Sequence, residues 1–525
     1  MIALIVAALN AFGDGDSALA ARMLPISLRD TGWLMGQVGV GTAVLGLFFA
    51  WLVTHFEFPG RRWFDWLLVL PLAVPTYLSA YAWVEFLDFT GPVQQLVRGL
   101  TGAEIIKAYW FPNIRTTSGA AFVMSLVLYP YVYLSCRAFF LMQSGSAASA
   151  ARVLGANGWR TFFTVTLPLS RPAIIVGVTL ALMEVVNDLG AVQYFGVNSL
   201  TAVIYAIWLN RGNFGGAAQL AVMIVLIIGL LIWLEQYARR KRAYLGGRDN
   251  QTTADRIFLT GGRAAAAFGA CVVIIGLGFF VPVSELLTLS VKKLTMGALP
   301  SGLFPALRNT LLLASAGAAF CVLLGYYTSW RANDERAGFG KGLISIATLG
   351  YAIPGTVLAL GLVAPLGMAD AWFNTVTQAV FNWHPGLVFS GSFFALLYAY
   401  SVRFVAVSHN TLDAARRRRG KSLLDAGRVL GAHNWRLIWR IDLPTLTPAF
   451  LSAATLVFVE CVKELPATLL LRPLGVETLA TLVYQQASAE LFDNAAIPAL
   501  GIVLAGLFPV ILATHLSTRR QGAPR

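Results

Sequence analysis

Two pairs of acidic residues stand inside apolar stretches of this sequence. Glu184 and Asp188 are four positions apart, and so are Glu460 and Glu464. On a helix this spacing places both carboxylates of a pair on one face, one turn apart. A carboxylate at mid-depth in a membrane costs about 2.5–3.5 kcal/mol, so we expect all four to face protein or water rather than lipid.

These four acids allow two interpretations. Carboxylate oxygens are hard ligands, so the acids can line a translocation path for a hard metal cation. Alternatively, they form a gate or a polar contact between helices, for instance with Lys463 or Arg403. The sequence leaves both interpretations open.

The other reactive residue types do not predict an enzyme. The four cysteines lie in apolar stretches without a Cys-x-x-Cys motif, and the five histidines lack metal-ligand spacing. Gly420-Lys421-Ser422 resembles the end of a phosphate-binding loop, but Ala415 replaces its first glycine and four arginines fill its middle. We therefore expect no catalytic residue, no firmly assigned metal site and no cofactor bound by this chain.

The composition indicates a membrane protein. Of the 525 residues, 57% are hydrophobic and only 12% are charged, whereas an ordinary soluble protein is about 25% charged. A span needs about 20 apolar residues, and a chain with this many spans can satisfy its backbone in lipid only as helices. The predicted spans are 31–54, 63–89, 116–142, 172–192, 216–236, 264–291, 308–330, 341–368, 386–410, 448–472 and 494–516.

The basic residues orient these spans. One set of loops carries 26 of the 39 Lys and Arg, and the opposite set carries 10. This bias places the first set in the cytoplasm. The runs Arg239–Arg242 and Arg416–Arg419 then mark the inner face beside anionic headgroups, and we expect no nucleic-acid partner.

The chain is duplicated. At an offset of 276 residues, positions 152–191 contain 17 identities in 40 without a gap, and further upstream Pro75 meets Pro354 at an offset of 279. We predict a first half at 1–236, a basic cytoplasmic linker at 237–263 and a second half at 264–525, related as parallel repeats. Only the short apolar segment Met1–Leu9 precedes the first repeat, so we expect a truncated first span and an intact architecture of six plus six.

The best-matched segments of the two halves lie on the cytoplasmic side. We expect each to be a short helix that ends at a glycine with positive φ, followed by Leu-Pro at the start of the next span. Such a helix outside the bilayer suits the docking of a cytoplasmic partner. The residues concerned are Ser149, Ala150, Ala151, Gly155, Leu167 and Pro168 in the first copy, and Asp425, Ala426, Gly427, Gly431, Leu443 and Pro444 in the second.

This pattern resembles the EAA loop of ABC-importer permeases, Glu-Ala-Ala-x3-Gly followed by Ile-x-Leu-Pro. Two departures stand out, since Ser149 replaces the acid and Gly427 replaces the second alanine. The resemblance implies an all-α polytopic membrane protein with the type I importer fold, in the bacterial inner membrane. It also implies that each loop docks on one of two ATP-binding subunits, which would hold the ATP and Mg²⁺, and that a periplasmic binding protein delivers the substrate.

A finer resemblance concerns the substrate. The stretches Ala181–Val197 and Lys463–Pro473 resemble the fused permeases of ferric-iron importers. Related permeases move thiamine, polyamines, sulfate or aminoalkylphosphonates, and these remain alternatives. An ion-coupled secondary carrier, using the buried acids, is the rival from another class.

Overall fold

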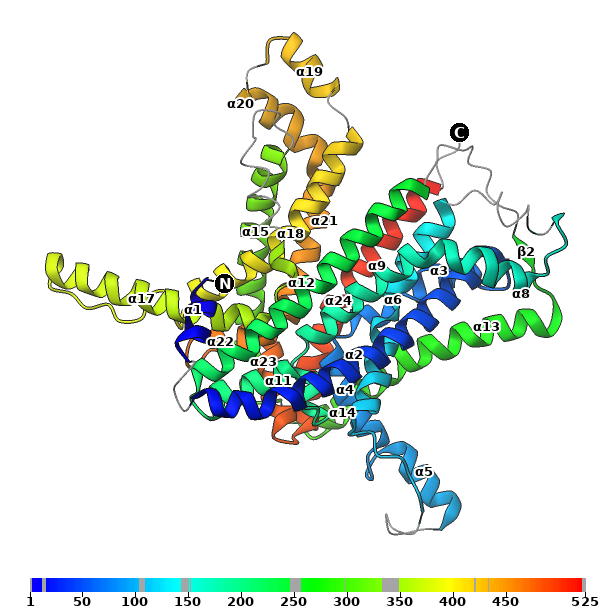
Figure 1. Cartoon of the computed structure of the whole chain (residues 1–525), viewed down its shortest axis with the longest axis horizontal. Helices are drawn as coiled ribbons and strands as arrows, with labels where there is room; N and C mark the ends of the chain where they lie inside the picture. Colours follow the sequence, from blue (N-terminus) through cyan, green and yellow to red (C-terminus); the bar gives the residue numbers. More distant parts are fainter. Residues whose placement is uncertain are drawn as a thin grey trace. The chain divides into compact units, whose positions relative to one another are not determined.

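The fold is almost entirely helical. The computed structural model describes residues 2–11, 16–102, 109–142, 151, 153–245, 256–297, 299–332, 349–419, 422–432 and 434–521 (Figure 1). Two strands of two residues each pair in parallel, with Phe56 opposite Ile257 and Glu57 opposite Phe258.

In the residues that the structure describes, the first half and the linker region contain α-helices, one short strand, one 3-10 turn and two π-helical turns. In chain order the elements are α1 (Ile2–Asn10), α2 (Asp16–His55), β1 (Phe56–Glu57), α3 (Arg61–Leu67), η1 (Leu70–Ala73), α4 (Thr76–Leu87), α5 (Pro92–Thr101), α6 (Thr117–Met142), α8 (Gly158–Thr161), η3 (Phe162–Thr166), α9 (Leu167–Asn187), α10 (Gly190–Tyr194), α11 (Leu200–Tyr205), η4 (Ala206–Asn210) and α12 (Phe214–Leu245).

The remainder of the chain is built in the same way. Its elements are β2 (Ile257–Phe258), α13 (Gly261–Ile275), η5 (Gly276–Phe280), α14 (Val281–Thr295), α15 (Leu303–Ala332), η6 (Leu349–Ala352), α17 (Gly355–Phe381), α18 (Phe393–Arg419), α19 (Ser422–Val429), α20 (Asn434–Leu437), η7 (Ile438–Asp442), α21 (Leu443–Lys463), α22 (Pro466–Leu471), α23 (Leu479–Ser488) and α24 (Phe492–Gln521).

Within the described residues, eight helices are long and apolar enough to cross a membrane. The predicted span 63–89 is not one straight helix, because the segments 61–73 and 76–101 meet at an angle of 89°. The break falls at Pro75, which lacks an N–H and forces Val74 into an extended conformation. The predicted span 386–410 corresponds to α18, which is not among the eight and buries Arg403 and His409.

The predicted span 494–516 corresponds to α24, whose segment Phe492–Leu507 is a shorter apolar helix outside the eight. Two further differences concern the ends of predicted segments. The beginning of the predicted span 341–368 lies outside the described residues, and α17 starts at Gly355. Helix α12 continues to Leu245, so the predicted basic linker begins as helix rather than as loop.

Each repeat builds a three-helix core at the same sequence positions. Helices α2, α6 and α9 pack together in one half, and α15, α18 and α21 pack together in the other. In both cores a glycine lets two helices approach closely. A Cβ at Gly46 would lie 2.5 Å from Cβ of Val132, and one at Gly325 would lie 2.4 Å from Cβ of Ser408. The repeat seen in the sequence therefore reproduces a helix crossing.

A second repeated contact involves a threonine on α2 and its counterpart on α15. The hydroxyl of Thr31 accepts the backbone N–H of Leu200 at 2.9 Å, and that of Thr310 accepts the N–H of Leu479 at 2.8 Å. Both hydroxyls satisfy a donor that a helix cannot satisfy itself at its N-terminus. The two pairs have the same separation in sequence, as expected for duplicated halves.

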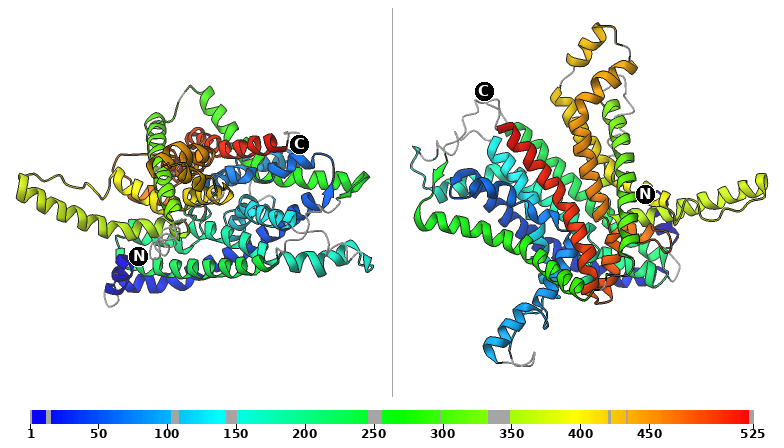
Figure 2. Two further views of the ribbon diagram at one scale, coloured as in Figure 1. Left: turned by 90° about the horizontal axis from the view of Figure 1, so that it is seen from above. Right: turned by 180° about the vertical axis from the view of Figure 1, so that it is seen from behind.

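The compact units of the structure are not the two sequence halves. One unit contains Leu299–Gln486 with the residues up to Leu4, and the other contains Ile5–Ala298 with Ala487 onward. Helices α13, α14 and α24 thus group with the first repeat. Helix α14 packs against α4 and α24 (Figure 2), and α24 also packs against η1. The division 1–236, 237–263 and 264–525 stays a prediction about the repeat, while packing groups the helices differently.

Candidate functional site: duplicated loops and interrupted helices

The second cytoplasmic segment ends in a tight helix cap. The N–H of Ala432 donates to the carbonyl of Gly427, and the N–H of Gly431 donates to that of Arg428, both at 3.0 Å. Gly431 has a φ of 79°. These two bonds and the left-handed glycine form a Schellman motif, which satisfies carbonyls that the helix leaves unpaired.

The first copy repeats this cap. Ser149 and Ala150 lie outside the described residues, but the N–H of Ala156 donates to the carbonyl of Ala151 at 3.0 Å and Gly155 has a φ of 85°. The prediction that both glycines adopt a positive φ is therefore confirmed. A side chain at either position would be strained.

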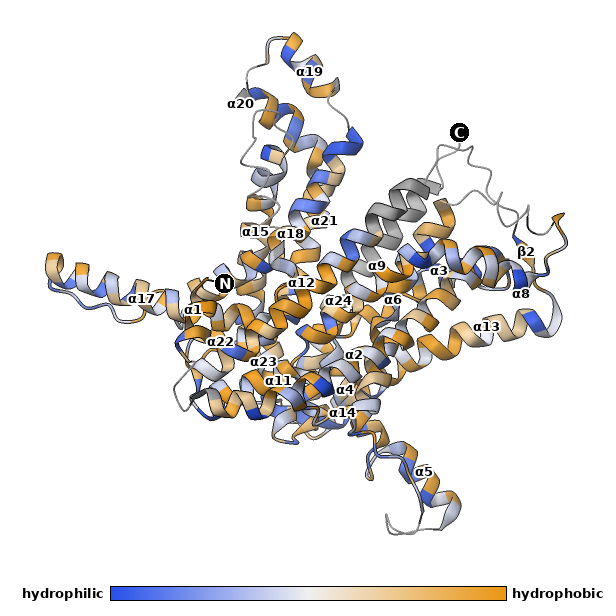
Figure 3. Cartoon of the chain, viewed as in Figure 1, coloured by the Kyte–Doolittle hydropathy of each residue, from blue (hydrophilic) through white to orange (hydrophobic). Residues whose placement is uncertain are grey.

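Both caps expose the same pair of apolar side chains. Val153 and Leu154 are each 87% exposed, and their counterparts Val429 and Leu430 are 87% and 86% exposed. Apolar side chains this exposed on a polar helix mark an interaction surface more than a single scattered residue does. Figure 3 shows hydrophobic and hydrophilic residues side by side on α19, and Asp425 pairs there with Arg428 at 3.0 Å.

The structure explains why Gly427 departs from the alanine of the pattern. A Cβ there would lie 2.6 Å from Cδ1 of Ile441 and 2.8 Å from Cδ2 of Leu437. The first copy has Ala151 instead of glycine, and Val165 and Thr161 at the positions of Ile441 and Leu437. The first copy thus combines a larger residue at this helix position with smaller residues at the two positions that Gly427 faces in the second copy.

The helix after each loop starts earlier than the Leu-Pro pair predicts. Leu167 and Leu443 begin α9 and α21, but a π-helical turn, η3 or η7, leads into each. A π turn shifts the hydrogen-bond register, so the chain can remain helical where Pro168 and Pro444 lack an N–H. The second loop is consequently joined to the membrane by a helical run from Trp435 to Lys463.

A buried charge cluster anchors the second loop and was not predicted. The carboxylate of Asp442, at the end of η7, accepts Arg416 at 2.8 Å, Arg419 at 2.7 Å and the hydroxyl of Tyr326 at 2.9 Å. Two arginines of the basic run thus bind protein rather than headgroups. Thr166 occupies the equivalent position in the first copy. Asp442 lies 23 residues after the end of this run, so its spacing in the sequence offers no signal of the contact.

Two of the four predicted acids do not sit on a helix. Asp188 and Glu464 follow the last residues of α9 and α21 and have extended backbones, with ψ of 126° and 114°. The predicted separation of about one turn within each pair is kept, but the second acid of each pair lies at the end of its helix and not inside it. Asp188 accepts the N–H of Ala191 at 2.7 Å, and Glu464 accepts that of Ala467 at 3.0 Å. Each acid interrupts its helix because its side chain satisfies the first turn of the next one.

The two interrupting acids use different second partners. Asp188 accepts the hydroxyl of Thr76, whereas the buried Glu464 pairs with the buried guanidinium of Arg403. The equivalent of Thr76 is Gly355, where a Cβ would lie 2.7 Å from Oε1 of Glu464. The longer acid thus takes the space of the missing threonine side chain. For Glu464, the predicted contact with Arg403 is confirmed.

The remaining acids keep their predicted positions. Glu184 and Glu460 lie on α9 and α21, one turn before the break, and both are half-buried. In the described part of the chain, no group of three or more His, Cys, Asp or Glu side chains is placed to hold a metal ion.

Duplicated helical cores, repeated cytoplasmic caps and interrupted helices define a polytopic permease built from two similar halves. Residues 43–244 and 321–522 each match the family described as the binding-protein-dependent transport system inner membrane component, so the chain belongs to this family. It is an ABC-type permease subunit and a multi-pass protein of the inner membrane. This membership excludes the ion-coupled carrier as its class.

Relatives match either the whole chain or one half of it. The Fe(3+)-transport system permease protein FbpB 2 of Haemophilus influenzae is 25% identical over 92% of this chain and 88% of its own length. The molybdenum transport system permease protein ModB of Escherichia coli is 31% identical over 37% of this chain and 86% of its own length. The sulfate transport system permease protein CysW of the same species is 27% identical over 45% of this chain.

Proposed function

We propose that this chain is the permease of an ATP-driven importer of ferric iron, served by two ATP-binding subunits and a periplasmic binding protein. The observation that carries the choice of substrate is the extent of similarity. A ferric permease matches both fused halves, whereas the molybdenum and sulfate permeases named above match only part of the chain.

The paired caps support the ATPase contacts. Each cap presents two exposed apolar side chains directly before a glycine whose backbone holds the helix end rigid. Burying them against a partner would contribute roughly 1.5–3 kcal/mol per side chain. One ATP-binding subunit would therefore sit on Val153 and Leu154, and the other on Val429 and Leu430.

The second loop has a direct mechanical link to the membrane. The helical run 435–463 contains 29 residues and is ~43 Å long at 1.5 Å per residue. Asp442 clamps its cytoplasmic end to α15 and α18, and Glu464 interrupts its other end. When the ATPases close on nucleotide, movement of the loop would be transmitted along this helix and open the path outward.

Glu184 and Glu460 are the remaining candidates for the path. The double variant Glu184→Gln, Glu460→Gln keeps their size and removes their charge. A transit role predicts that iron uptake falls much more than ATP turnover stimulated by the loaded binding protein. A packing role predicts that both fall together, and unchanged uptake would remove the two acids from the path.

The substrate is tested by uptake. The permease, its ATPase and its binding protein are expressed together in a strain that lacks its own ferric importer, and accumulation of radioactive iron is measured. Excess unlabelled molybdate, sulfate, thiamine, a polyamine or an aminoalkylphosphonate should leave iron uptake unchanged. If no iron accumulates and a labelled form of one of these solutes does, the permease is assigned to that solute.

A further inference from the structure

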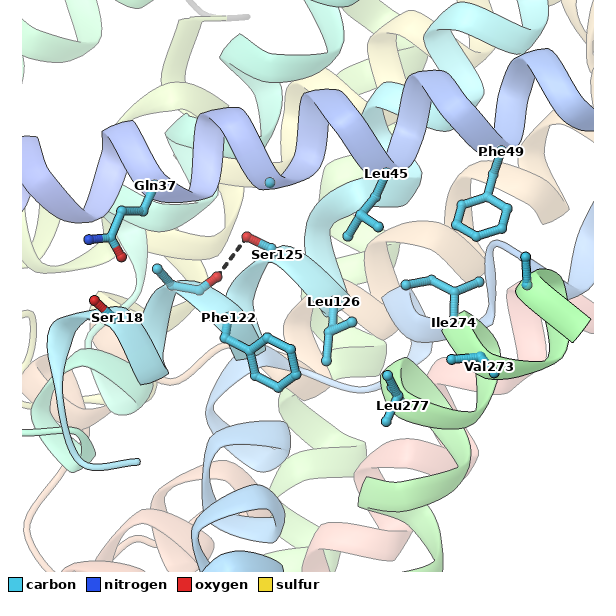
Figure 4. A pocket seen from close by; sticks show the side chains of 13 residues that line it. Gln37, Leu45, Phe49, Ser118, Phe122, Ser125, Leu126, Val273, Ile274 and Leu277 are labelled. Carbon is cyan, nitrogen blue, oxygen red and sulfur yellow. Dashed lines mark hydrogen bonds between the residues drawn. The ribbon is translucent and has the colours of Figure 1, made fainter. Parts of the chain in front are cut away.

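A groove runs between α2, α6 and α13, within the unit that contains the first repeat. Its volume is about 630 Å³. Figure 4 shows Gln37 and Ser118 at one end of the groove, Phe49 toward the other, and Leu126 between them. Phe122 and Val273 form an accessible rim, with 45% and 59% of their surfaces exposed.

The floor of the groove is apolar because its hydroxyl group is already satisfied. The Ser125 hydroxyl donates to the carbonyl of Ala121 at 2.6 Å, as the dashed line in Figure 4 shows. Gly41 lies against Ser125 so closely that a Cβ would come within 2.4 Å of its hydroxyl oxygen. The missing side chain at Gly41 lets α2 approach α6 this closely, and the groove runs beside their contact.

The length of the groove suits an acyl chain. Gln37 and Phe49 both line it on α2 and are ~18 Å apart along a helix axis. One leaflet of the hydrocarbon core is about 15 Å thick, half of the usual 30 Å. The helices that form the walls are candidate membrane spans, so the groove lies at the depth of lipid tails.

A polar pocket adjoins the outer end of the groove. It shares Ser118 with the groove and is otherwise lined by Arg29, Asp30, Gly32, Trp33, Thr116 and Thr117. Arg29 donates to Asp30 at 3.0 Å, but its side chain is 77% exposed. The pair contributes little to stability because Arg29 is so exposed, and its guanidinium is available to a ligand. The side chain of Asp30 is only 16% exposed and lies directly beside that guanidinium. Trp33 is also exposed, as aromatic residues at a membrane boundary are.

We propose that this groove and pocket together bind one zwitterionic phospholipid of the outer leaflet, such as phosphatidylethanolamine. The guanidinium of Arg29 would hold the phosphate, for which its planar fork is suited. The carboxylate of Asp30 would hold the ammonium group, and one acyl chain would fill the groove beside Gly41. Adjacent opposite charges match a headgroup that carries both signs better than a purely anionic one.

The second repeat lacks both halves of this site. Phe320 stands at the position of Gly41 and Asn309 at that of Asp30. A large ring stands where the first repeat has a glycine, and the amide of Asn309 carries no charge for an ammonium group. The proposed site is therefore single and asymmetric, and the second repeat supplies matched controls at equivalent positions.

The test is the lipid content of the purified full-length chain. The protein is extracted from membranes containing phosphatidylethanolamine and phosphatidylglycerol, and retained lipids are counted by native mass spectrometry. We expect one tightly held phosphatidylethanolamine. Ala270→Phe, which fills the groove from α13, and Arg29→Ala should each reduce its occupancy at least fivefold. The controls are Val272→Phe on the same helix outside the groove, and Arg308→Ala at the position equivalent to Arg29.

Three results would overturn the proposal. Equal retention in Ala270→Phe and the unmodified chain would show that the groove holds no lipid tail. Equal loss in Arg29→Ala and Arg308→Ala would show a non-specific charge effect. If phosphatidylglycerol binds as tightly as phosphatidylethanolamine, Asp30 does not recognise an ammonium group. Circular dichroism of each variant establishes that any loss of lipid is not loss of fold.

Discussion

At the scale of residues, the two repeats keep one geometry with different side chains. Thr76 and Asp188 in the first half become Gly355 and Glu464 in the second, and Arg403 completes the second site. Glu464 has one more methylene group than Asp188, and this extra length compensates for the side chain that Gly355 lacks relative to Thr76. Because the exchanged groups touch each other, their substitutions are expected to be non-additive.

The ion pair of Arg403 gives the first prediction. Arg403→Met leaves the carboxylate of Glu464 buried without its cation, and we expect a loss of about 3–5 kcal/mol in the free energy of unfolding. Adding Glu464→Gln should recover most of this loss, since no buried charge remains. Thermal unfolding in detergent measures both, with Arg428→Ala at an exposed pair as the control. A double variant as unstable as the single one would contradict the prediction.

The packing below the second loop gives another prediction at this scale. Gly427→Ala brings a methyl group against Cδ1 of Ile441, and we expect a loss of about 1–3 kcal/mol from overpacking. Ile441→Val, which copies Val165 of the first repeat, should relieve it. Protease cleavage within 422–432 reports on the loop locally. If adding Ile441→Val to Gly427→Ala does not restore protection from the protease, the difference in side-chain size between the two copies has no packing role.

At the scale of elements, a short helix outside the bilayer is coupled to a long one inside it. The Schellman cap holds α19 in shape, η7 carries the chain past Pro444, and Asp442 ties this junction to α15 and α18. The first loop has the same cap but Thr166 in place of Asp442. The two loops therefore share the proposed docking surface, and the second has an additional ionic anchor at Asp442.

This difference predicts unequal roles for the exposed pairs. Val429→Ser with Leu430→Ser should abolish most co-purification of the ATPase without lowering the unfolding temperature, because both side chains are exposed. The double variant Val153→Ser, Leu154→Ser should weaken the binding of an ATPase subunit at the first loop. Transport should suffer more from the change in the firmly anchored second loop. Normal ATPase recovery from a chain carrying all four serines would show that the contacts lie elsewhere.

At the scale of the whole molecule, helices cross the boundary between the sequence repeats. Helices α13, α14 and α24 belong to the second half by sequence, yet α14 packs against α4 and α24 packs against η1. The close approach at Gly278, where a Cβ would lie 2.8 Å from the carbonyl oxygen of Leu126, is part of this exchange. Fusion of the halves keeps these contacts within one chain.

The packing of α14 and α24 against the first half predicts how the two halves behave when they are separated. Fragments 1–250 and 251–525, cut within the basic segment and expressed together, should co-purify in detergent. The second fragment alone should aggregate, because α14 and α24 then expose the surfaces that α4 and η1 cover. Size-exclusion chromatography distinguishes the cases. A monodisperse second fragment would show that these helices do not need the first half.

The sequence by itself determined the membrane class, the duplication and the glycines that end both loops, and the cytoplasmic side of the loops stays a prediction. Each of these depends on local composition or on short patterns such as a glycine at a helix end. The extended backbone at Asp188 and Glu464, the anchoring of Asp442, the grouping of α14 with α4 and the groove beside Gly41 were decided by tertiary structure. Each depends on partners far apart in the chain, and hydropathy and spacing do not encode which apolar face or buried charge finds which partner.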